Sequence, residues 1–269
     1  MKKLEVLVSA LNNDPEQLIG RMNLSSDAVI INQTDHKDKR TVSLDRDHMV
    51  RIFECTDRGV GASRNKALSK AEDEIILFSD EDIVYDKGYE KKILKAFAEN
   101  ADADIILFNI EVDERRRTYW IDKKTKVGRL NSGRYPAYSA AARLSSIKKS
   151  GVGFSLLFGG GAPYSNGEDS LFFMDCIRSG LKIVAVPVKL GREDFRESTW
   201  FKGYNEKFFF DRGVLYHFLY RRAAVILGFR FVAAKRKIMC REVNAFKAFS
   251  LLCAGIRKGK KLDKSSGGR

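Results

Sequence analysis

The chain has 269 residues, 44% hydrophobic and 31% charged, which is enough for one substantial core and a small appendage. This composition excludes a disordered or a fibrous protein. The four cysteines and three histidines are scattered without a CxxC pair, so neither a zinc site nor a disulfide framework is indicated, and we expect a reduced, cytoplasmic compartment.

The formal net charge of +14 is concentrated at one end of the chain. Residues 221–269 contain fourteen lysines and arginines against two acidic residues, so this segment carries +12 and residues 1–220 only +2. Aromatic and aliphatic residues are mixed with the basic ones, and no uncharged stretch approaches the ~18 residues of a spanning helix. We therefore expect a basic amphipathic helical extension on an anionic membrane surface.

Two alternatives remain for this basic extension. Nucleic-acid binding is the functional rival, but no recognised motif supports it, and we expect no nucleic-acid partner. The structural alternative is a helix packed on the core, followed by a solvated tail over 257–269.

Strands and helices are predicted to alternate through the first 110 residues. Glu5 interrupts the apolar start of the chain, which favours a first strand over a signal peptide. Strands are expected over 4–10, 28–31, 50–53, 75–78 and 105–110, and helices over 15–22, 62–71 and 87–99. Such alternation predicts a parallel sheet covered by helices on both faces, with ligands bound at the carboxyl ends of its strands.

The second half of the chain is less regular. Residues 111–150 are polar and basic, which suggests a hairpin or an acceptor-side insertion, and a helix is expected over 139–149. Glycines at 159–161 mark a loop. Glu168 and Asp169 precede an apolar run and predict a buried helix that begins at this acidic pair. A last strand is expected over 181–188.

Residues 59–82 carry the most informative pattern, namely a glycine turn, a helix and a buried strand that ends in three carboxylates. Gly59 and Gly61 permit a tight turn or a close backbone approach. Successive side chains of an extended chain point to opposite sides, so Asp80 and Asp82 are expected on one side and Glu81 on the other. Oxygen ligands at this spacing suit Mg²⁺ or Mn²⁺ carrying a diphosphate.

Competing motifs fit this segment less well. Arg64 occupies the third glycine position of a dinucleotide fingerprint, and the absence of GxxxxGK[ST] excludes a P-loop. Arg64 and Asn65 are either exposed helix residues or, given the acidic strand that follows, ligand contacts. Glu168 and Asp169 either cap a helix or supply a general base for a sugar hydroxyl.

The motifs and their order along the chain resemble those of family 2 glycosyltransferases with the GT-A fold. This group includes bacterial capsule and cell-wall polysaccharide transferases. The resemblance spans about residues 1–190. It rests on the strand 4–10, the helix beginning at Gly61, the DxD form Asp80-Glu81-Asp82 and the ED motif Glu168-Asp169. It implies an α/β GT-A domain over 1–220, with a nucleotide-binding part at 1–110 and an acceptor part at 111–220, before the extension at 221–269.

The resemblance also implies site roles. Asp82 coordinates the divalent cation, Mn²⁺ or Mg²⁺, and Asp80 contacts the metal shell or the ribose or sugar of the donor. Asp169, with Glu168 beside it, is the base that deprotonates the acceptor hydroxyl. The remaining donor-site residues are Ser9 in the base pocket, Arg64 near the base or diphosphate, Gly61 and Glu81.

One departure concerns the nucleotide base. Family members often end the second strand with an acidic pair, whereas this chain has Asn32-Gln33-Thr34-Asp35. Base preference is therefore open, and Asn32, Gln33 or Asp35 is expected to take over the base contact.

The implied reaction is inverting, metal-dependent transfer of a sugar from a nucleotide-diphosphate donor, with a UDP-sugar favoured. The acceptor is a glycan or lipid-linked hydroxyl, and the enzyme is a hexosyltransferase of surface polysaccharide or glycolipid biosynthesis, cytoplasmic or peripheral on the inner face of the cell membrane. One alternative is a nucleotidyltransferase, for which residues 9–13 lack the glycine-rich basic signature. The other is a non-catalytic binding protein, which the intact acids at 80, 82 and 169 do not favour.

Overall fold

The computed structural model describes all residues except 1–2, 114–116, 118, 195–202 and 266–269. Contacts divide the chain into two compact units. The sheet unit comprises Met1–Phe154 and Phe172–Arg196, and the helical unit comprises Ser155–Leu171 and Glu197–Arg269. The predicted boundary after residue 220 stays a prediction, although these units divide the chain differently.

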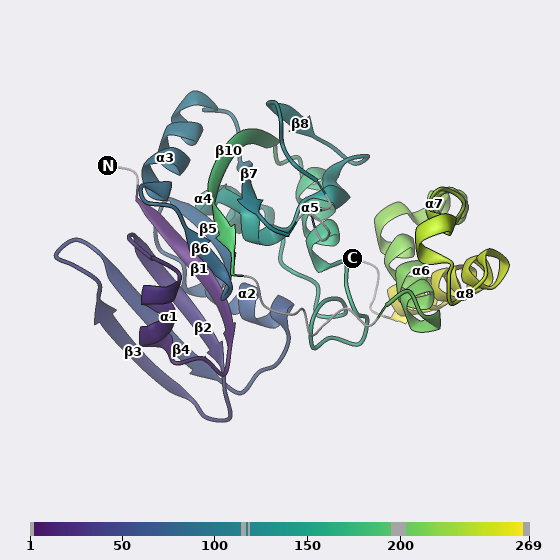
Figure 1. Cartoon of the computed structure of the whole chain (residues 1–269), viewed down its shortest axis with the longest axis horizontal. Helices are drawn as coiled ribbons and strands as arrows, with labels where there is room; N and C mark the ends of the chain where they lie inside the picture. Colours follow the sequence, from purple (N-terminus) through teal and green to yellow (C-terminus); the bar gives the residue numbers. More distant parts are fainter. Residues whose placement is uncertain (1–2, 114–116, 118, 195–202, 266–269) are drawn as a thin grey trace. The chain divides into compact units, whose positions relative to one another are not determined.

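Among the described residues, one ten-stranded sheet forms the sheet unit (Figure 1). Its order is β3-β4-β2-β1-β5-β9-β7-β10-β6, with β8 paired to β10. The strands are β1 Leu4–Leu11, β2 Asp27–Gln33, β3 Asp38–Ser43, β4 Met49–Cys55, β5 Ile75–Asp80, β6 Ile83–Tyr85, β7 Ile105–Glu111, β8 Thr125–Val127, β9 Ala140–Arg143 and β10 Ile183–Glu193. The block β4-β2-β1-β5 and the pair β7-β10 are parallel, as predicted.

Unbroken apolar runs explain why the parallel strands lie at the centre. Strands β1, β2, β5 and β7 are buried along almost their whole length, as expected of a sheet covered on both faces. The register places Ser9 of β1 directly beside Asp80 of β5, and Asn32 of β2 beside Ala10. Ser9, Asn32 and Asp80, which lie at the carboxyl ends of these strands, therefore meet at one edge of the sheet.

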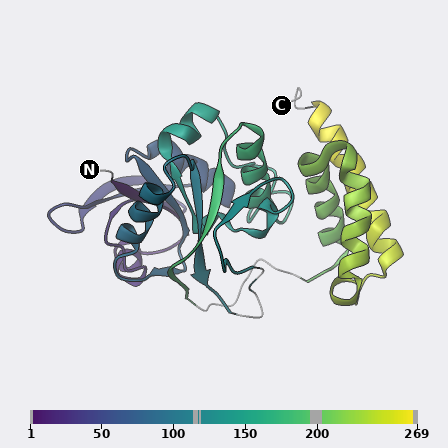
Figure 2. The same cartoon turned by 90° about the horizontal axis from the view of Figure 1, so that it is seen from above.

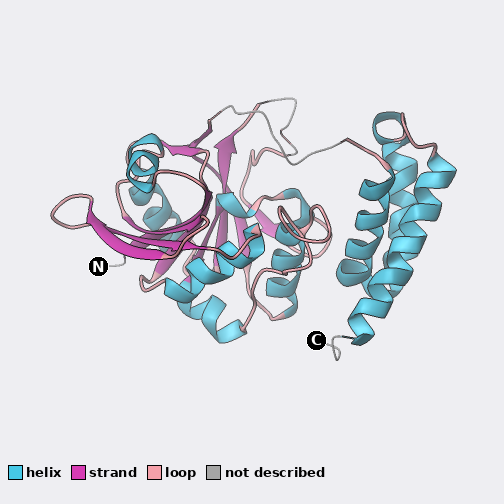
Figure 3. Ribbon diagram, turned by 90° about the horizontal axis from the view of Figure 1, so that it is seen from below, coloured by secondary structure: helices cyan, strands magenta, loops and turns pink. Residues whose placement is uncertain are grey.

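Helices cover both faces, as predicted (Figure 3). On one face α1 Pro15–Arg21 and α3 Tyr89–Glu99 pack Leu18, Ile93 and Phe97 against the strands. On the other face lie α2 Val60–Lys70, α4 Leu144–Ser150 and the later turns of α5 Glu168–Arg178. Helix α5 begins at the acidic pair, which confirms that prediction. Short 3₁₀ turns cover Ser132–Arg134 and Ala137–Ser139.

The predicted helix over 139–149 is wrong in its first part. Residues Ala140–Arg143 form β9, which pairs antiparallel with β5 and β7, and the helix begins only at Leu144. Alanine favours helices, but these alanines are fully buried in the sheet, so strand pairing overrides local propensity. The short strands β3, β6 and β8 were not predicted, and they make the edges of the sheet antiparallel.

The helical unit contains α6 Glu206–Tyr220, a 3₁₀ turn at Arg221–Ala223, α7 Ala224–Met239 and α8 Ala245–Ser265. These helices run alongside one another, drawn from green to yellow in Figure 2. A Cβ added to Gly255 would collide with the carbonyl oxygen of Phe210, so the backbones of α6 and α8 are in contact. Helix α8 continues to Ser265, which overturns the alternative of a solvated tail for residues 257–265. Among the described helices, none is both long and apolar enough to cross a bilayer.

Candidate active site

Ser9 contributes a polar atom without a partner at the carboxyl edge of the sheet. It lies near the end of β1 beside Asp80, and its residue is only 8% exposed. Its hydroxyl Oγ makes no hydrogen bond with any residue that the structure describes. A buried hydroxyl left unsatisfied costs roughly 1–3 kcal/mol, so the Ser9 hydroxyl does not stabilise the fold, and its predicted contact with the nucleotide base stays a prediction.

Asp80 is held in place by Arg64. The Nη2 of Arg64 donates a hydrogen bond to Oδ1 of Asp80 at 2.8 Å, and the Arg64 side chain is 3% exposed against 29% for Asp80. The guanidinium carbon of Arg64 lies 5.2 Å from the centre of the Phe154 ring. Arg64 therefore orients Asp80 from the protein interior, and direct contact of Arg64 with the nucleotide stays a prediction.

The neighbouring motif residues fix this arrangement. Asn65 accepts a hydrogen bond from the Phe154 N–H at 2.7 Å and donates one to the Phe154 carbonyl at 2.8 Å, which holds the ring against Arg64. Gly59 precedes α2 at φ +109°, a left-handed conformation that glycine adopts readily and that confirms the predicted turn. Gly61 is buried within the first turn of α2.

Asp82 lies in the turn between β5 and β6, where negative charge is crowded. Its carbonyl oxygen accepts a hydrogen bond from the Asp194 N–H at 2.6 Å. Burial, together with the charges of Asp80 and Glu193, raises the pKa of Asp82 to about 7. A cation bound here would offset this repulsion, which makes Asp82 well suited as a metal ligand.

Glu81 is turned toward the loop after β1. Its Oε2 accepts hydrogen bonds from the Leu11 N–H and from Nδ2 of Asn13, both at 2.6 Å. In the structure Glu81 therefore anchors the start of the β1–α1 connection. Its predicted contact with the donor stays a prediction.

Asn32 and Gln33, predicted to read the base, form hydrogen bonds within the protein. The Nδ2 of fully buried Asn32 donates to the Asn13 carbonyl and to Glu54, and its Oδ1 accepts from the Asn13 N–H. Oε1 of Gln33 accepts from the Gly59 N–H at 2.7 Å. These two side chains therefore stabilise the loops around the site, and their base contact stays a prediction.

Asp35 differs because its side chain is exposed. Its carboxylate lies 3.0 Å from Nδ1 of His36, and this pairing lowers the pKa of Asp35. Hydrogen bonds with Asp35 and then with Glu54 raise the pKa of His36 in return. Of the three residues predicted to contact the base, Asp35 is the one whose side chain is exposed to solvent, whereas Asn32 and Gln33 are buried.

Glu168 and Asp169 occupy the first turn of α5, where the helix dipole favours carboxylates. Gly167 precedes them at φ +116°, and its N–H donates to Oε2 of Glu168 at 3.0 Å. Both acids belong to the helical unit, whereas Asp80 and Asp82 belong to the sheet unit. Their assignment as the catalytic base pair therefore stays a prediction.

Glu193 and Asp194 belong to the site but were not predicted from the sequence. The last strand was expected over 181–188. In the structure an irregularity between Ala185 and Lys189 accommodates Pro187, and β10 continues to Glu193. The signal available in the sequence was a second acidic pair after an apolar run.

The oxygen donors present fit a divalent cation that also binds a diphosphate. Over the described ranges, no group of three or more His, Cys, Asp or Glu side chains converges on a metal position. Mg²⁺ and Mn²⁺ in nucleotide sites commonly take one or two carboxylates and complete their shell with phosphate oxygens and water. Asp80 and Asp82, crowded by Glu193, match that pattern.

A comparison with protein families gives one match. Residues 25–152 match the model described as glycosyl transferase family 2, a range that includes α2 and the carboxylates at 80–82. No curated protein matches the chain. The family match confirms the resemblance expected from the motifs and supports neither the nucleotidyltransferase nor the non-catalytic alternative.

Two solved structures with a similar fold contain nucleotide sugars. TarS 1–349 from S. aureus in complex with UDP-GlcNAc is 16% identical, with a TM-score of 0.62, and the match covers 90% of this chain and 74% of that chain. The mannosyltransferase PcManGT from Pyrobaculum calidifontis, in complex with GDP-Man and Mn²⁺, is 15% identical, with a TM-score of 0.54 and coverage of 99% and 76%. At these identities the likeness shows the fold, and it confirms the predicted GT-A architecture.

Proposed function

Because the chain carries a family 2 glycosyltransferase domain on the GT-A fold, we propose that it transfers a sugar from a nucleotide-diphosphate donor to a hydroxyl acceptor with inversion. The observation that carries this proposal is the pair Asp80 and Asp82 at the carboxyl edge of the sheet, beside the unpartnered hydroxyl of Ser9. Open sheets of this kind bind their ligands at that edge.

We propose a hexose donor, with a UDP-sugar favoured. The similar structures of TarS and PcManGT contain UDP-GlcNAc and GDP-Man respectively, which supports a nucleotide-sugar donor and leaves the base open. Exposed Asp35 and the hydroxyl of Ser9 are the side chains best placed to contact the nucleoside.

Asp82 and Asp80 would hold Mn²⁺ or Mg²⁺ in this proposal. The ion, when bound, would supply positive charge to the diphosphate leaving group. Arg64 fixes the orientation of Asp80 through the hydrogen bond to Oδ1, so this carboxylate is pre-organised before the donor arrives.

Asp169 would accept the proton of the acceptor hydroxyl, with Glu168 shaping the same turn of α5. A carboxylate that acts as a general base must stay ionised until the acceptor binds, and the first turn of a helix favours that form. The position of the acid pair directly after the glycine at 167 supports this role.

Donor hydrolysis and transfer with a panel of nucleotide sugars test the proposal. With Mn²⁺ present, Asp82→Asn and Asp169→Asn should each lose at least about a hundredfold in kcat while remaining folded. Glu99→Gln, at the exposed end of α3, is the matched control and should retain full turnover. Near-parental turnover in either active-site variant would contradict the role assigned to that residue. Activity that survives EDTA would contradict the proposed requirement for a metal ion.

We also propose that the helical unit docks on an anionic membrane that presents a lipid-linked acceptor, at the inner face of the cell membrane. Val225, Ile226 and Phe229 of α7 are exposed, and Phe246 of α8 is 93% exposed. The rings of Phe229 and Phe249 are 5.6 Å apart, which joins the two helices in one apolar surface. Residues 221–269 hold fourteen basic residues against two acids, and each basic residue near an anionic surface contributes about 1 kcal/mol.

Flotation with vesicles tests the membrane proposal. The protein should float with phosphatidylglycerol vesicles at low salt and remain at the bottom with phosphatidylcholine vesicles. Phe229→Glu should weaken flotation, whereas Leu130→Glu, an exposed leucine of the sheet unit, should leave it unchanged. Protein that does not float with anionic vesicles at low salt would contradict docking.

A further inference from the structure

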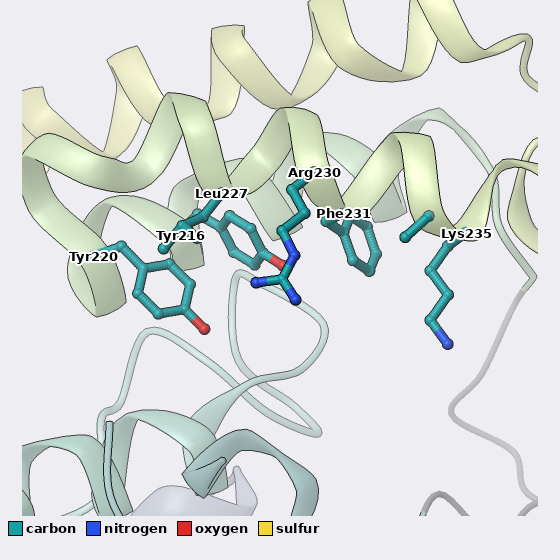
Figure 4. A pocket seen from close by; sticks show the side chains of 7 residues that line it. Tyr216, Tyr220, Leu227, Arg230, Phe231 and Lys235 are labelled. Atoms are coloured by element: carbon teal, nitrogen blue, oxygen red, sulfur yellow. The ribbon is translucent and has the colours of Figure 1, made fainter. Parts of the chain in front are cut away.

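A groove in the helical unit lies between α6 and α7 (Figure 4). Tyr216 and Tyr220 come from α6, and the other lining residues are Leu227, Arg230, Phe231, Ala234 and Lys235 of α7. In Figure 4 the guanidinium of Arg230 extends between the hydroxyl groups of the two tyrosines. The groove therefore combines an apolar wall with a cluster of hydrogen-bond donors.

The cations at this groove have no anionic partner in the part of the chain that the structure describes. Neither Arg230 nor Lys235 forms an ion pair there. Arg212, one helical turn before Tyr216, has a buried Nε without a hydrogen-bond partner, and its guanidinium lies between the rings of Phe208 and Phe231, at 5.2 and 5.5 Å. Ring contacts do not satisfy N–H donors, so the part of the helical unit around the groove has an excess of positive charge and of hydrogen-bond donors.

The tyrosines supply further donors. Burial raises the pKa of Tyr216 to about 12 and raises that of Tyr220, so both hydroxyls stay protonated at neutral pH. The ring of Tyr216 lies 5.0 Å from that of Tyr220 and 5.8 Å from that of Phe231. These rings form a continuous aromatic surface beside the guanidinium of Arg230.

A phosphate group matches this set of donors better than a carboxylate does. It presents three acceptor oxygens and more than one negative charge when it is a monoester, whereas a carboxylate presents two oxygens and one charge. Arginine binds phosphate oxygens through its planar fork, and phenol hydroxyls can complete the shell. The apolar walls made by Leu227, Phe231 and Ala234 would contact an apolar chain attached to the phosphate.

We propose that the groove between α6 and α7 binds the phosphate headgroup of an amphiphilic phosphomonoester, with Arg230, Lys235 and the two tyrosines holding the phosphate. The site is distinct from the exposed apolar surface of α7, because Ile226 and Phe229 do not line it. It requires no assumption about the chemistry at Asp80 and Asp82.

Calorimetric titration of the full chain tests this site. Dioctanoyl phosphatidic acid below its critical micelle concentration is the main probe, inorganic phosphate tests the headgroup alone, and octyl glucoside tests the apolar chain alone. We expect phosphatidic acid to bind most tightly, phosphate more weakly and octyl glucoside not at all. Equal affinity for phosphate and phosphatidic acid would overturn the apolar part of the proposal.

Charge variants separate a built site from general attraction. Arg230→Met with Lys235→Met should weaken phosphatidic acid binding by roughly tenfold or more, because two charged hydrogen-bond donors are lost. Arg222→Met with Arg236→Met removes the same charge from exposed positions of the helical unit outside the groove and is the matched control. An equal loss in both double variants would overturn the proposal. Donor hydrolysis should be unchanged in both, which keeps this test independent of the proposed reaction.

Discussion

Arg64 of α2 and Asp80 of β5 form a hydrogen-bonded ion pair of 2.8 Å with the guanidinium almost fully buried. This pair joins the two ends of the segment 59–82, since the helix after the glycine turn supplies the cation and the strand supplies the carboxylate. Asn65 supports the pair from behind by fixing Phe154 against the guanidinium. Helix α2 and strand β5 therefore position the Asp80 carboxylate together.

Replacing Arg64 should reduce both activity and stability. In Arg64→Met, Asp80 loses the partner that orients it, and we expect transfer to fall at least about a hundredfold. Loss of one partner of a buried pair costs about 3–5 kcal/mol, and we expect about 1–3 kcal/mol here because Asp80 is 29% exposed. Urea unfolding and donor turnover are the measurements.

Lys95→Met is the matched control for Arg64→Met. Lys95 pairs with Glu99 on the exposed surface of α3, and such pairs contribute at most about 1 kcal/mol. If the two variants behave alike, the Arg64–Asp80 pair has no special role in the site.

Ser9 and Asn32 should respond in opposite ways to removal of their polar groups. Ser9→Ala deletes a buried hydroxyl without a partner, so stability should be unchanged or rise by up to about 1 kcal/mol, while the KM for the donor rises. Asn32→Ala breaks hydrogen bonds to Asn13 and Glu54 and should cost about 2–3 kcal/mol. Thermal unfolding and donor kinetics distinguish the two, and a destabilised Ser9→Ala with unaltered KM would show that Ser9 is structural.

The sheet and the carboxylate cluster were predictable because their signals are local. Apolar runs such as Ile75–Phe78 predict buried strands, and acids directly after such a run fall at the carboxyl edge by geometry alone. The glycine at 59 was recognisable for the same reason, because a left-handed turn before a helix favours this residue.

The remaining features depend on contacts between distant segments. The sequence of Ala140–Arg143 favours a helix, but β5 and β7 pair with it from both sides. The extension of β10 to Glu193 depends on its irregular pairing with β7. The internal hydrogen bonds of Asn32 and Asn65 come from residues up to 89 positions away, so their sequence neighbours could not reveal them. Long-range pairing thus decides which motif residues face the ligand and which hold the fold.

Asp73 should make the stability of the sheet unit depend on pH. Burial, followed by the charges of Glu5 and Asp27, raises its pKa from 3.8 to about 6 in the folded chain. The folded state therefore binds the proton more tightly, and stability falls as the pH rises from about 4 to about 6. Asp73→Asn removes this penalty and should stabilise the protein above pH 6 by about 1 kcal/mol, since the partial exposure of Asp73 reduces the ~3 kcal/mol that the full shift would give.

Urea unfolding at pH 4 and pH 8 measures the effect of Asp73→Asn. The variant and the parent should be nearly equal at pH 4 and differ at pH 8. Asp102→Asn is a control of opposite sign, because hydrogen bonds from the backbone and Lys182 lower the pKa of exposed Asp102, so its replacement should not stabilise at pH 8. A constant difference between Asp73→Asn and the parent at both pH values would refute the assignment.

Gly255 should be intolerant of any side chain, because it is where α6 and α8 touch. The Cβ of Gly255→Ala would collide with the Phe210 carbonyl oxygen and lie 2.9 Å from the backbone nitrogen of Val214, so the helices must separate and open the core around Leu252. Overpacking of this kind costs typically 1–3 kcal/mol, and we expect the upper part of that range because backbone cannot give way. Gly20→Ala in α1 is the control, since its Cβ meets nothing within 4 Å and should be neutral or stabilising by up to about 1 kcal/mol. Urea unfolding of the two variants compares them directly, and equal stability would mean that α6 and α8 are not in backbone contact.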